Sequence, residues 1–91
     1  MPSLNNLTAV ISGASSGVGE ALSLGLALEG MRLRLIGRDQ QRLEAVAIRC
    51  RQNSRDVLSY AADISVDRDV ELLSASLLRD CAAVDVLIHS A

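Results

Sequence analysis

The amino-acid sequence predicts an α/β fold with a doubly wound parallel sheet. Short apolar runs alternate with helical periodicity, the segments follow the order β-α-β-α-β-α-β, and the connections between them are short. Strands separated by helices pair in parallel, and right-handed crossovers place the helices on the faces of the sheet. The prediction is therefore a Rossmann-type arrangement in a partial form.

The first half of the chain predicts a strand, a helix and a second strand. Residues 7–12 form an apolar run that ends at Gly13, and a helix is expected from Gly17. Gly30 has the place of the left-handed residue that ends a helix, and residues 32–36 then alternate like a strand. The first helix is apolar nearly all round, which predicts burial on more than one side. Its main apolar face contains Val18, Ala21, Leu22, Gly25 and Leu26.

The second half continues the same alternation. Asp39 is expected to cap a second helix, and residues 57–61 make a third strand. Ser65 is expected to cap a third helix, and residues 84–88 make a fourth strand. The expected buried faces are Leu43, Val46, Ala47 and Cys50 in the second helix, and Val70, Leu73 and Leu77 in the third.

Composition limits the classes of protein to which the chain can belong. The 91 residues are 49% hydrophobic with a mean hydropathy of +0.28, which excludes intrinsic disorder. A net charge of −2 and a single aromatic residue, Tyr60, argue against a nucleic-acid partner. The uncharged stretch over residues 7–19 is too short, and too rich in Gly and Ser, to span a membrane.

The sequence shows no secretory signal and no set of metal ligands. Residues 1–6 carry no basic region, and a cytoplasmic location is expected. His89 is the single histidine, and Cys50 and Cys81 lie far apart, so a zinc site is not expected. We expect two free thiols, with a disulfide as the alternative.

A glycine-rich turn between the first strand and the first helix is a candidate anion site. Gly13, Gly17 and Gly19 follow the spacing G-x-x-x-G-x-G. Unpaired N–H groups and the positive end of the helix dipole face such a turn, and glycines allow a pyrophosphate to approach the backbone. The alternative is a tight turn without a ligand. The position in the first β-α unit favours a nucleotide, and the missing Lys-Ser/Thr pair excludes a Walker A loop.

Four motifs together resemble the short-chain dehydrogenase/reductase family. Residues 12–19 match its Thr-Gly-x-x-x-Gly-x-Gly motif with Ser12 in place of threonine, and Gly37-Arg38 is similar to its NADP-type ending of the second strand. Residues 63–65 resemble its Asp-Val-Ser/Thr, and residues 85–91 resemble the strand that leads into its Asn-Asn-Ala-Gly. His89 and Ser90 depart from the family by replacing the two asparagines.

The turn and the resemblance together give a set of cofactor-binding candidates. In the family, the aspartate of the third motif meets the adenine ring, a role that the resemblance gives to Asp63. The alternative for Asp63 is that it caps backbone groups of the strand-to-helix loop. Ser15 and Ser16 either donate to phosphate or only form the turn. Tyr60 is interpreted as a packing residue, and no catalytic or metal-binding residue is assigned. The candidates are Gly13, Ser15, Ser16, Gly17, Val18, Gly19, Arg38, Asp63, Ile64 and Ala91.

Arg38 predicts NADP rather than NAD as the cofactor. The end of the second strand approaches the adenosine ribose, where an acidic residue selects NAD and a cation accommodates the 2′-phosphate of NADP. Gly37 leaves room for that phosphate. The alternative is a solvated arginine, although a cation at a helix start is unfavourably placed against the dipole.

The resemblance implies hydride transfer between a nicotinamide and an alcohol or carbonyl in the complete protein. The family handles the substrate proton with a tyrosine and a lysine four residues later, but this chain has Ile64 four residues after Tyr60 and no lysine. We therefore expect residues 1–91 to be the N-terminal part of a single dinucleotide-binding domain, without the catalytic half and inactive alone. Substrate binding and homo-oligomers are expected of the complete protein. The alternative is a non-enzymatic nucleotide-binding or interaction module built on half a Rossmann fold.

Overall fold

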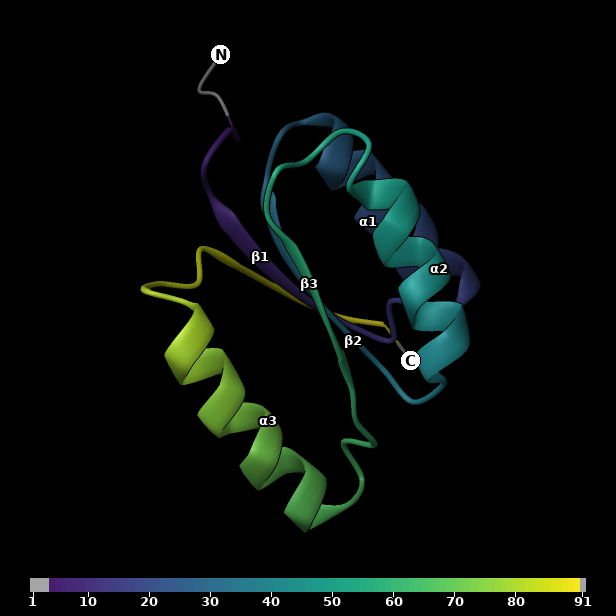
Figure 1. The fold of residues 1–91 in the computed structure, drawn as a ribbon, viewed down its shortest axis with the longest axis vertical. Coiled ribbons are helices and arrows are strands. Elements are labelled where there is room, and N and C mark those ends of the chain that lie inside the picture. Colours follow the sequence, from purple (N-terminus) through teal and green to yellow (C-terminus); the bar gives the residue numbers. More distant parts are fainter. Residues whose placement is uncertain (1–3, 91) are drawn as a thin grey trace.

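The computed structural model describes residues 4–90, which form one parallel sheet with helices on both faces (Figure 1). The strand order is β3-β2-β1-β4, and every pair is parallel. The predicted doubly wound α/β class and the predicted order of elements are confirmed. The elements are β1 (Thr8–Ser12), α1 (Gly17–Leu28), β2 (Arg32–Gly37), α2 (Gln40–Cys50), β3 (Val57–Ala61), α3 (Asp67–Asp80) and β4 (Val86–His89).

The helices divide between the two faces of the sheet. Helices α1 and α2 lie together on one face, and α3 lies on the other (Figure 1). The face under α1 and α2 carries the larger core, in which Ile11, Leu33 and Leu35 are fully buried. The face under α3 carries a smaller cluster of Val10, Ile36 and Ala62. The main apolar core is therefore on the side of α1 and α2.

The predicted buried face of α1 is wrong. The residues of α1 that are buried against the rest of the protein are Gly19, Ser23 and Ala27, whereas the side chain of Val18 is 68% exposed. Small residues face the sheet because α1 lies so close to the β1 turn that a Cβ at Gly19 would overlap the Gly13 carbonyl group. Val18, Leu22 and Leu28 are exposed, whereas Leu24 and Leu26 pack partly against the main core. A shallow groove on the outer side of the helix is lined by Gly17, Val18, Ala21, Leu22, Gly25 and Leu26.

Helix α2 agrees with the sequence prediction. Its buried residues are Leu43, Val46, Ala47 and Cys50. The carboxylate of Asp39 accepts a hydrogen bond of 3.2 Å from the backbone N–H of Arg42, as expected of an N-cap.

Gly30, with φ of +76°, follows α1 in the expected left-handed conformation. Cys50 and Cys81 are free thiols.

Helix α3 rests more lightly on the sheet and begins later than predicted. None of its residues is fully buried; Leu73 and Leu77 pack partly against the smaller cluster, and Val70 is 38% exposed. The predicted cap, Ser65, does not cap the helix: the N-cap position belongs to Val66, and the Ser65 hydroxyl donates to Asp63 instead. No helix within residues 4–90 is long and apolar enough to cross a membrane.

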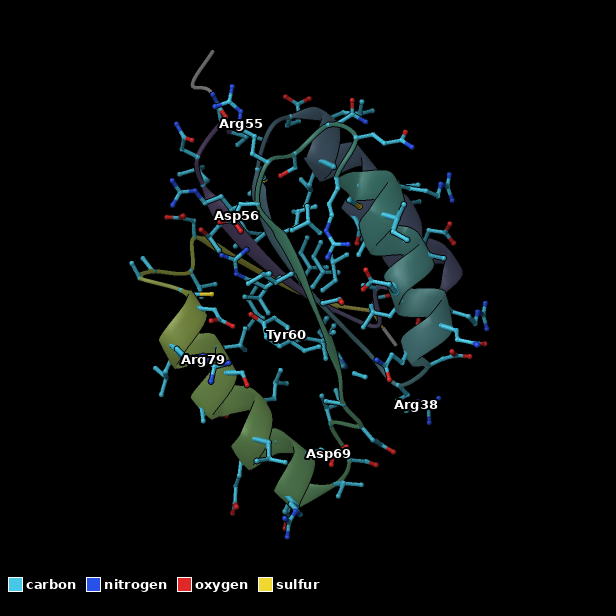
Figure 2. All side chains as sticks on the ribbon, in the orientation of Figure 1. Arg38, Arg55, Asp56, Tyr60, Asp69 and Arg79 are labelled. Carbon is cyan, nitrogen blue, oxygen red and sulfur yellow. The ribbon has the colours of Figure 1, made fainter. Side chains whose placement is uncertain are left out.

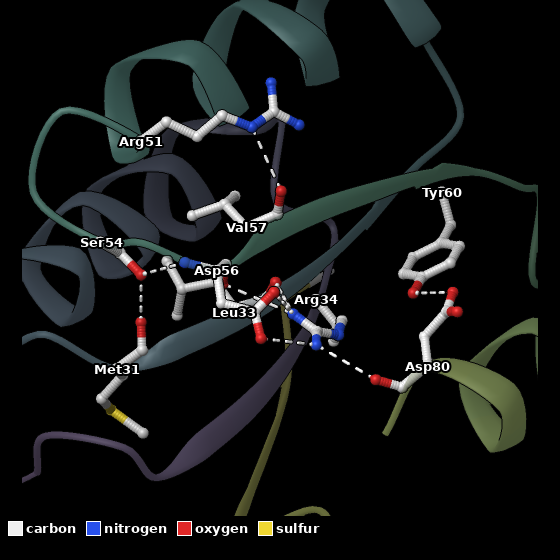
Figure 3. A network of polar contacts seen from close by, with 9 residues as sticks. All are labelled: Met31, Leu33, Arg34, Arg51, Ser54, Asp56, Val57, Tyr60 and Asp80. Atoms are coloured by element: carbon white, nitrogen blue, oxygen red, sulfur yellow. Dashed lines mark hydrogen bonds and ion pairs between the residues drawn. The ribbon is translucent and has the colours of Figure 1, made fainter. Parts of the chain in front are cut away.

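Polar contacts fix the C-terminal end of α3 (Figure 3). Arg34, a buried residue of β2, forms an ion pair of 2.9 Å with Asp56 and donates a hydrogen bond of 3.1 Å to the carbonyl oxygen of Asp80. The Tyr60 hydroxyl donates to the Asp80 carboxylate at 2.8 Å. Burial, followed by this hydrogen bond, raises the pKa of Tyr60. The predicted packing residue Tyr60 thus also holds α3.

Candidate functional site

A cleft of about 550 Å³ opens at the carboxyl ends of the strands. Its lining comes from four places: the β1–α1 turn, the end of β2 with the start of α2, the β3–α3 loop, and the end of β4. In the sheet, β1 lies between β2 and β4, so the order of the strands reverses at β1. Open α/β sheets bind ligands at such a reversal. The volume is within the range of small-molecule pockets.

The glycines of the β1–α1 turn allow its backbone to pack closely. Gly13 has φ of +68°, and a Cβ there would meet the Ser90 carbonyl carbon at 3.0 Å. A Cβ at Gly19 would stand 2.8 Å from the Gly13 carbonyl carbon. Any larger residue at either position must displace backbone. These two glycines are therefore required by the shape of the turn, before any ligand is considered.

Gly17 has a different environment. It lines the cleft, and a Cβ built on it would meet nothing within 4 Å. It is also the first residue of α1, where backbone N–H groups have no acceptor within the helix. Open space beside free donors and the positive end of a helix dipole is the environment that a phosphate group requires. The turn thus fits the pyrophosphate of a dinucleotide.

The two serines of the turn have different roles in the structure. The Ser16 hydroxyl donates a hydrogen bond of 2.7 Å to the Gly13 carbonyl oxygen, so its proton is used within the turn. Ser15 lies beside the end of β2, where its Oγ would be 3.0 Å from a Cβ on Gly37. Both serines line the cleft. Val18, by contrast, is not among the lining residues and faces outward.

The end of β2 places two arginines in the cleft. Arg38 and Arg42 both line it, together with Gly37 and Asp39. The Asp39 carboxylate is engaged as the cap of α2. Arg38 directly follows β2, and its guanidinium makes no hydrogen bond or ion pair with another residue of the described range 4–90. Figure 2 shows it well separated from Arg55.

The β3–α3 loop forms the opposite wall. Asp63 and Ile64 line the cleft as the sequence predicted. Oδ1 of Asp63 accepts hydrogen bonds from the hydroxyl and the backbone N–H of Ser65, at 2.6 and 2.9 Å. These hydrogen bonds lower the pKa of Asp63, and the charge of Arg38 contributes in the same direction. Asp63 is therefore a structured carboxylate that orders the loop.

The end of β4 completes the cleft with residues that the sequence did not single out as ligands. His89 and Ser90 line it, and His89 Nδ1 lies 2.6 Å from the Ser12 hydroxyl. The departure from the Asn-Asn pattern was the available signal for these positions. Ala91, the last predicted site residue, lies outside the described residues. The structure thus brings all the other predicted residues except Val18 and Gly19 to the surface of one cleft.

The fold and the cleft together define a dinucleotide-binding type of α/β protein, because a glycine-rich β1–α1 turn opens at the point where the strand order reverses. The family model of short chain dehydrogenases matches residues 7–91. The chain belongs to the short-chain dehydrogenase/reductase family.

Individual relatives agree with this assignment. Human dehydrogenase/reductase SDR family member 13 is 38% identical over 93 residues, covering 100% of this chain and 25% of the relative. L-sorbose reductase from Gluconobacter frateurii, solved with NADPH and L-sorbose, has a TM-score of 0.87 and 31% identity, covering 96% of this chain and 34% of that one. The 3-ketoacyl-(acyl-carrier-protein) reductase from Brucella melitensis, solved with NADH, has a TM-score of 0.80 and 34% identity, covering 93% and 34%. The chain thus spans about a quarter to a third of the length of these proteins.

Proposed function

We propose that this chain is the NADP(H)-binding portion of a short-chain oxidoreductase, which in its complete form transfers hydride between a nicotinamide and an alcohol or carbonyl. When bound, the nicotinamide supplies or accepts the hydride. The residues of this chain hold the rest of the cofactor. The single observation that carries the NADP assignment is the position of Arg38 in the cleft, next to Gly37.

The β1–α1 turn supports the general part of the proposal. Gly17 borders open space at the start of α1, and the N–H groups of the first helical turn face the cleft region without intrahelical acceptors. These donors would hold the pyrophosphate, which is common to NAD and NADP. The turn therefore supports dinucleotide binding but does not discriminate between the two cofactors.

The β2 end supports the specific part. The ribose of the adenosine half reaches this position in doubly wound folds. Oδ1 of Asp39 accepts the capping hydrogen bond of α2, whereas Arg38, directly after Gly37, presents a cation to the cleft. A guanidinium matches the geometry of a phosphate, so the 2′-phosphate of NADP is the expected partner of Arg38.

The proton chemistry of the reaction must come from residues other than those of this chain. Tyr60 is its single tyrosine, and the chain contains no lysine. Tyr60 does not line the cleft; its hydroxyl is bound to Asp80, and its pKa is raised rather than lowered, chiefly by burial. A proton donor that works near neutral pH needs the opposite shift. Tyr60 is therefore structural.

The test is a titration of NADPH and NADH against the purified chain and two variants, followed by calorimetry. A charge-assisted hydrogen bond contributes about 1.5–3 kcal/mol, so Arg38→Ala should weaken NADPH binding roughly 10- to 150-fold and change NADH binding little. Arg55→Ala is the matched control, because it removes the same charge at a position well separated from Arg38 (Figure 2). It should leave both affinities unchanged.

The outcomes separate the two levels of the proposal. Equal losses of NADH and NADPH affinity in Arg38→Ala would mean that the arginine contacts a shared part of the dinucleotide, and the NADP assignment would be wrong. Absence of binding of either dinucleotide to the wild-type chain would contradict the whole proposal and favour an interaction module.

A further inference from the structure

His89 is held in the cleft by one of its two ring nitrogens. It pairs with Ser12 in the β1–β4 register, and its Nδ1 lies 2.6 Å from the Ser12 hydroxyl oxygen. Within residues 4–90, the other nitrogen, Nε2, has no hydrogen-bond partner. The imidazole therefore has a fixed anchor on the sheet and one nitrogen available to a ligand.

The Ser12 hydroxyl can hold the ring in both protonation states. A neutral imidazole either accepts the hydroxyl proton at Nδ1, with the ring proton on Nε2, or donates Nδ1–H to the hydroxyl oxygen, which leaves Nε2 as an acceptor. Toward an imidazolium, the hydroxyl oxygen accepts from Nδ1–H, and Nε2 again carries a proton. The imidazolium always presents Nε2–H, and one neutral tautomer does so too, so an anionic oxygen at Nε2 selects these forms of the ring.

The position of His89 matches the path of a dinucleotide. The residue lies at the end of β4, and its partner Ser12 directly precedes Gly13 of the anion-binding turn. The strand order reverses at β1, next to β4, and the pyrophosphate of a dinucleotide crosses the sheet at such a reversal. His89 and Gly17 at the start of α1 both line the cleft, and the end of β4 lies against the turn, because a Cβ on Gly13 would meet the Ser90 carbonyl group.

The other charged side chains that line the cleft sum to zero, so the net charge of the cleft depends on the protonation of His89. The start of α2 and the end of β2 contribute Arg38, Asp39 and Arg42, and the β3–α3 loop contributes Asp63. The β1–α1 turn and the end of β4 contribute no other charged side chain to the lining. Two arginines and two aspartates give a formal charge of zero, so protonation of His89 makes the cleft positive.

We propose that His89 is a cofactor-contacting residue that donates Nε2–H to a phosphate oxygen of the dinucleotide, and that Ser12 is its positioning residue. Binding consequently strengthens when the imidazole takes up a proton. This inference rests on the proposed function of the cleft. The histidine that replaces the family's asparagine at position 89 would then contribute to dinucleotide affinity.

The experiment is a calorimetric titration of NADH against the 91-residue chain between about pH 5.5 and pH 8, the range in which histidine changes its charge. NADH is the probe because the 2′-phosphate of NADPH itself titrates near pH 6, as phosphate monoesters do. The wild-type chain should bind NADH about fivefold more tightly at the acid end. His89→Asn, which restores the family residue, should bind with an affinity that does not vary with pH.

A second variant separates contact from positioning. Ser12→Ala keeps the imidazole but removes its anchor, so NADH affinity should fall about threefold across the range while the pH dependence remains. Since His89 is the only histidine of the chain, no other imidazole can account for the profile.

Three results would overturn the inference. A pH-independent affinity in the wild type, or an unchanged pH dependence in His89→Asn, would show that His89 does not contact the phosphate, while leaving the proposed function intact. Ser12→Ala with wild-type affinity would remove the positioning role. Failure of both NADH and NADPH to bind at any pH would instead refute the proposed function and, with it, the inference.

Discussion

Substitution of Gly19 tests the packing of α1 against the β1 turn. An alanine Cβ at this position would stand 2.8 Å from the Gly13 carbonyl carbon and 3.1 Å from the Ala14 Cα. The Cβ would overlap the Gly13 carbonyl oxygen even more closely. Non-bonded heavy atoms prefer separations of about 3.5–4.0 Å, so α1 or the turn must move by more than about 1 Å. All of these neighbours are backbone atoms, so no side-chain rotation can relieve the overlap.

The expected cost follows from two opposing contributions. Overpacking in a tight site typically costs about 1–3 kcal/mol and occasionally more, and the backbone overlap here places Gly19→Ala at or above the upper end. Alanine recovers about 1 kcal/mol of helix propensity over glycine. The net loss of unfolding free energy should be about 2–3 kcal/mol, which lowers the Tm of a domain of this size by roughly 10–20 °C.

Gly25→Ala is the matched control for this substitution. Gly25 lies in the same helix, and a Cβ there would meet nothing within 4 Å. This variant should gain the propensity without the clash, so its Tm should rise by about 4–8 °C. Gly17→Ala has the same free space but lines the cleft, so it should keep stability and lose dinucleotide affinity. Thermal denaturation of the three variants, with NADPH titrations of each, measures both effects. Equal stability of Gly19→Ala and Gly25→Ala would refute the packing argument.

Three further predictions concern activity, association and pH. The purified chain should not oxidise NADPH with any carbonyl substrate, because it has no lysine to pair with its one tyrosine; measurable turnover would contradict this. The unpaired edge of β4 and the 74% exposed Leu87 should cause association at micromolar concentration, which sedimentation would detect and Leu87→Lys would reduce. The hydrogen bond from Tyr60 lowers the pKa of Asp80 in the folded protein. The stabilisation from this hydrogen bond is therefore complete above 3.8, the pKa of Asp80 in the unfolded chain, and is lost as the pH falls below that value. Tyr60→Phe should therefore flatten the acid side of a pH-dependent denaturant titration, and an unchanged profile would exclude this coupling.

The sequence predicted the glycine turn and the end of β2 because both depend on local constraints. The spacing of Gly13, Gly17 and Gly19 fixes the turn, and Asp39 fixes the start of α2, as the hydrogen bond to Arg42 shows. Each of these features involves residues only a few positions apart, so a linear pattern contains the information needed.

Apolar periodicity did not predict the buried face of α1 or the Ser12–His89 contact. Apolar periodicity marked the side of α1 with Val18, but it could not show that the close approach to Gly13 selects small residues for the inner side. Ser12 and His89 are separated by 77 positions, and their contact exists only because β4 pairs with β1. The pairing of β4 with β1, which a single sequence does not encode locally, decided the Ser12–His89 contact.

The light packing of α3 predicts that, within residues 4–90, the cleft wall next to this helix opens most easily. Helix α3 has no fully buried residue, and its C-terminal end is held by hydrogen bonds to Asp80. Segments with few buried apolar contacts open locally at low free energy, well below that of global unfolding. Amide hydrogens of α3 should therefore exchange with solvent before those of α1 and α2. Asp63 and Ile64 lie in the loop that leads into α3, so each such opening also loosens the side of the cleft where the adenine would lie. A bound dinucleotide would therefore slow hydrogen exchange in α3, although this helix supplies no lining residue to the cleft.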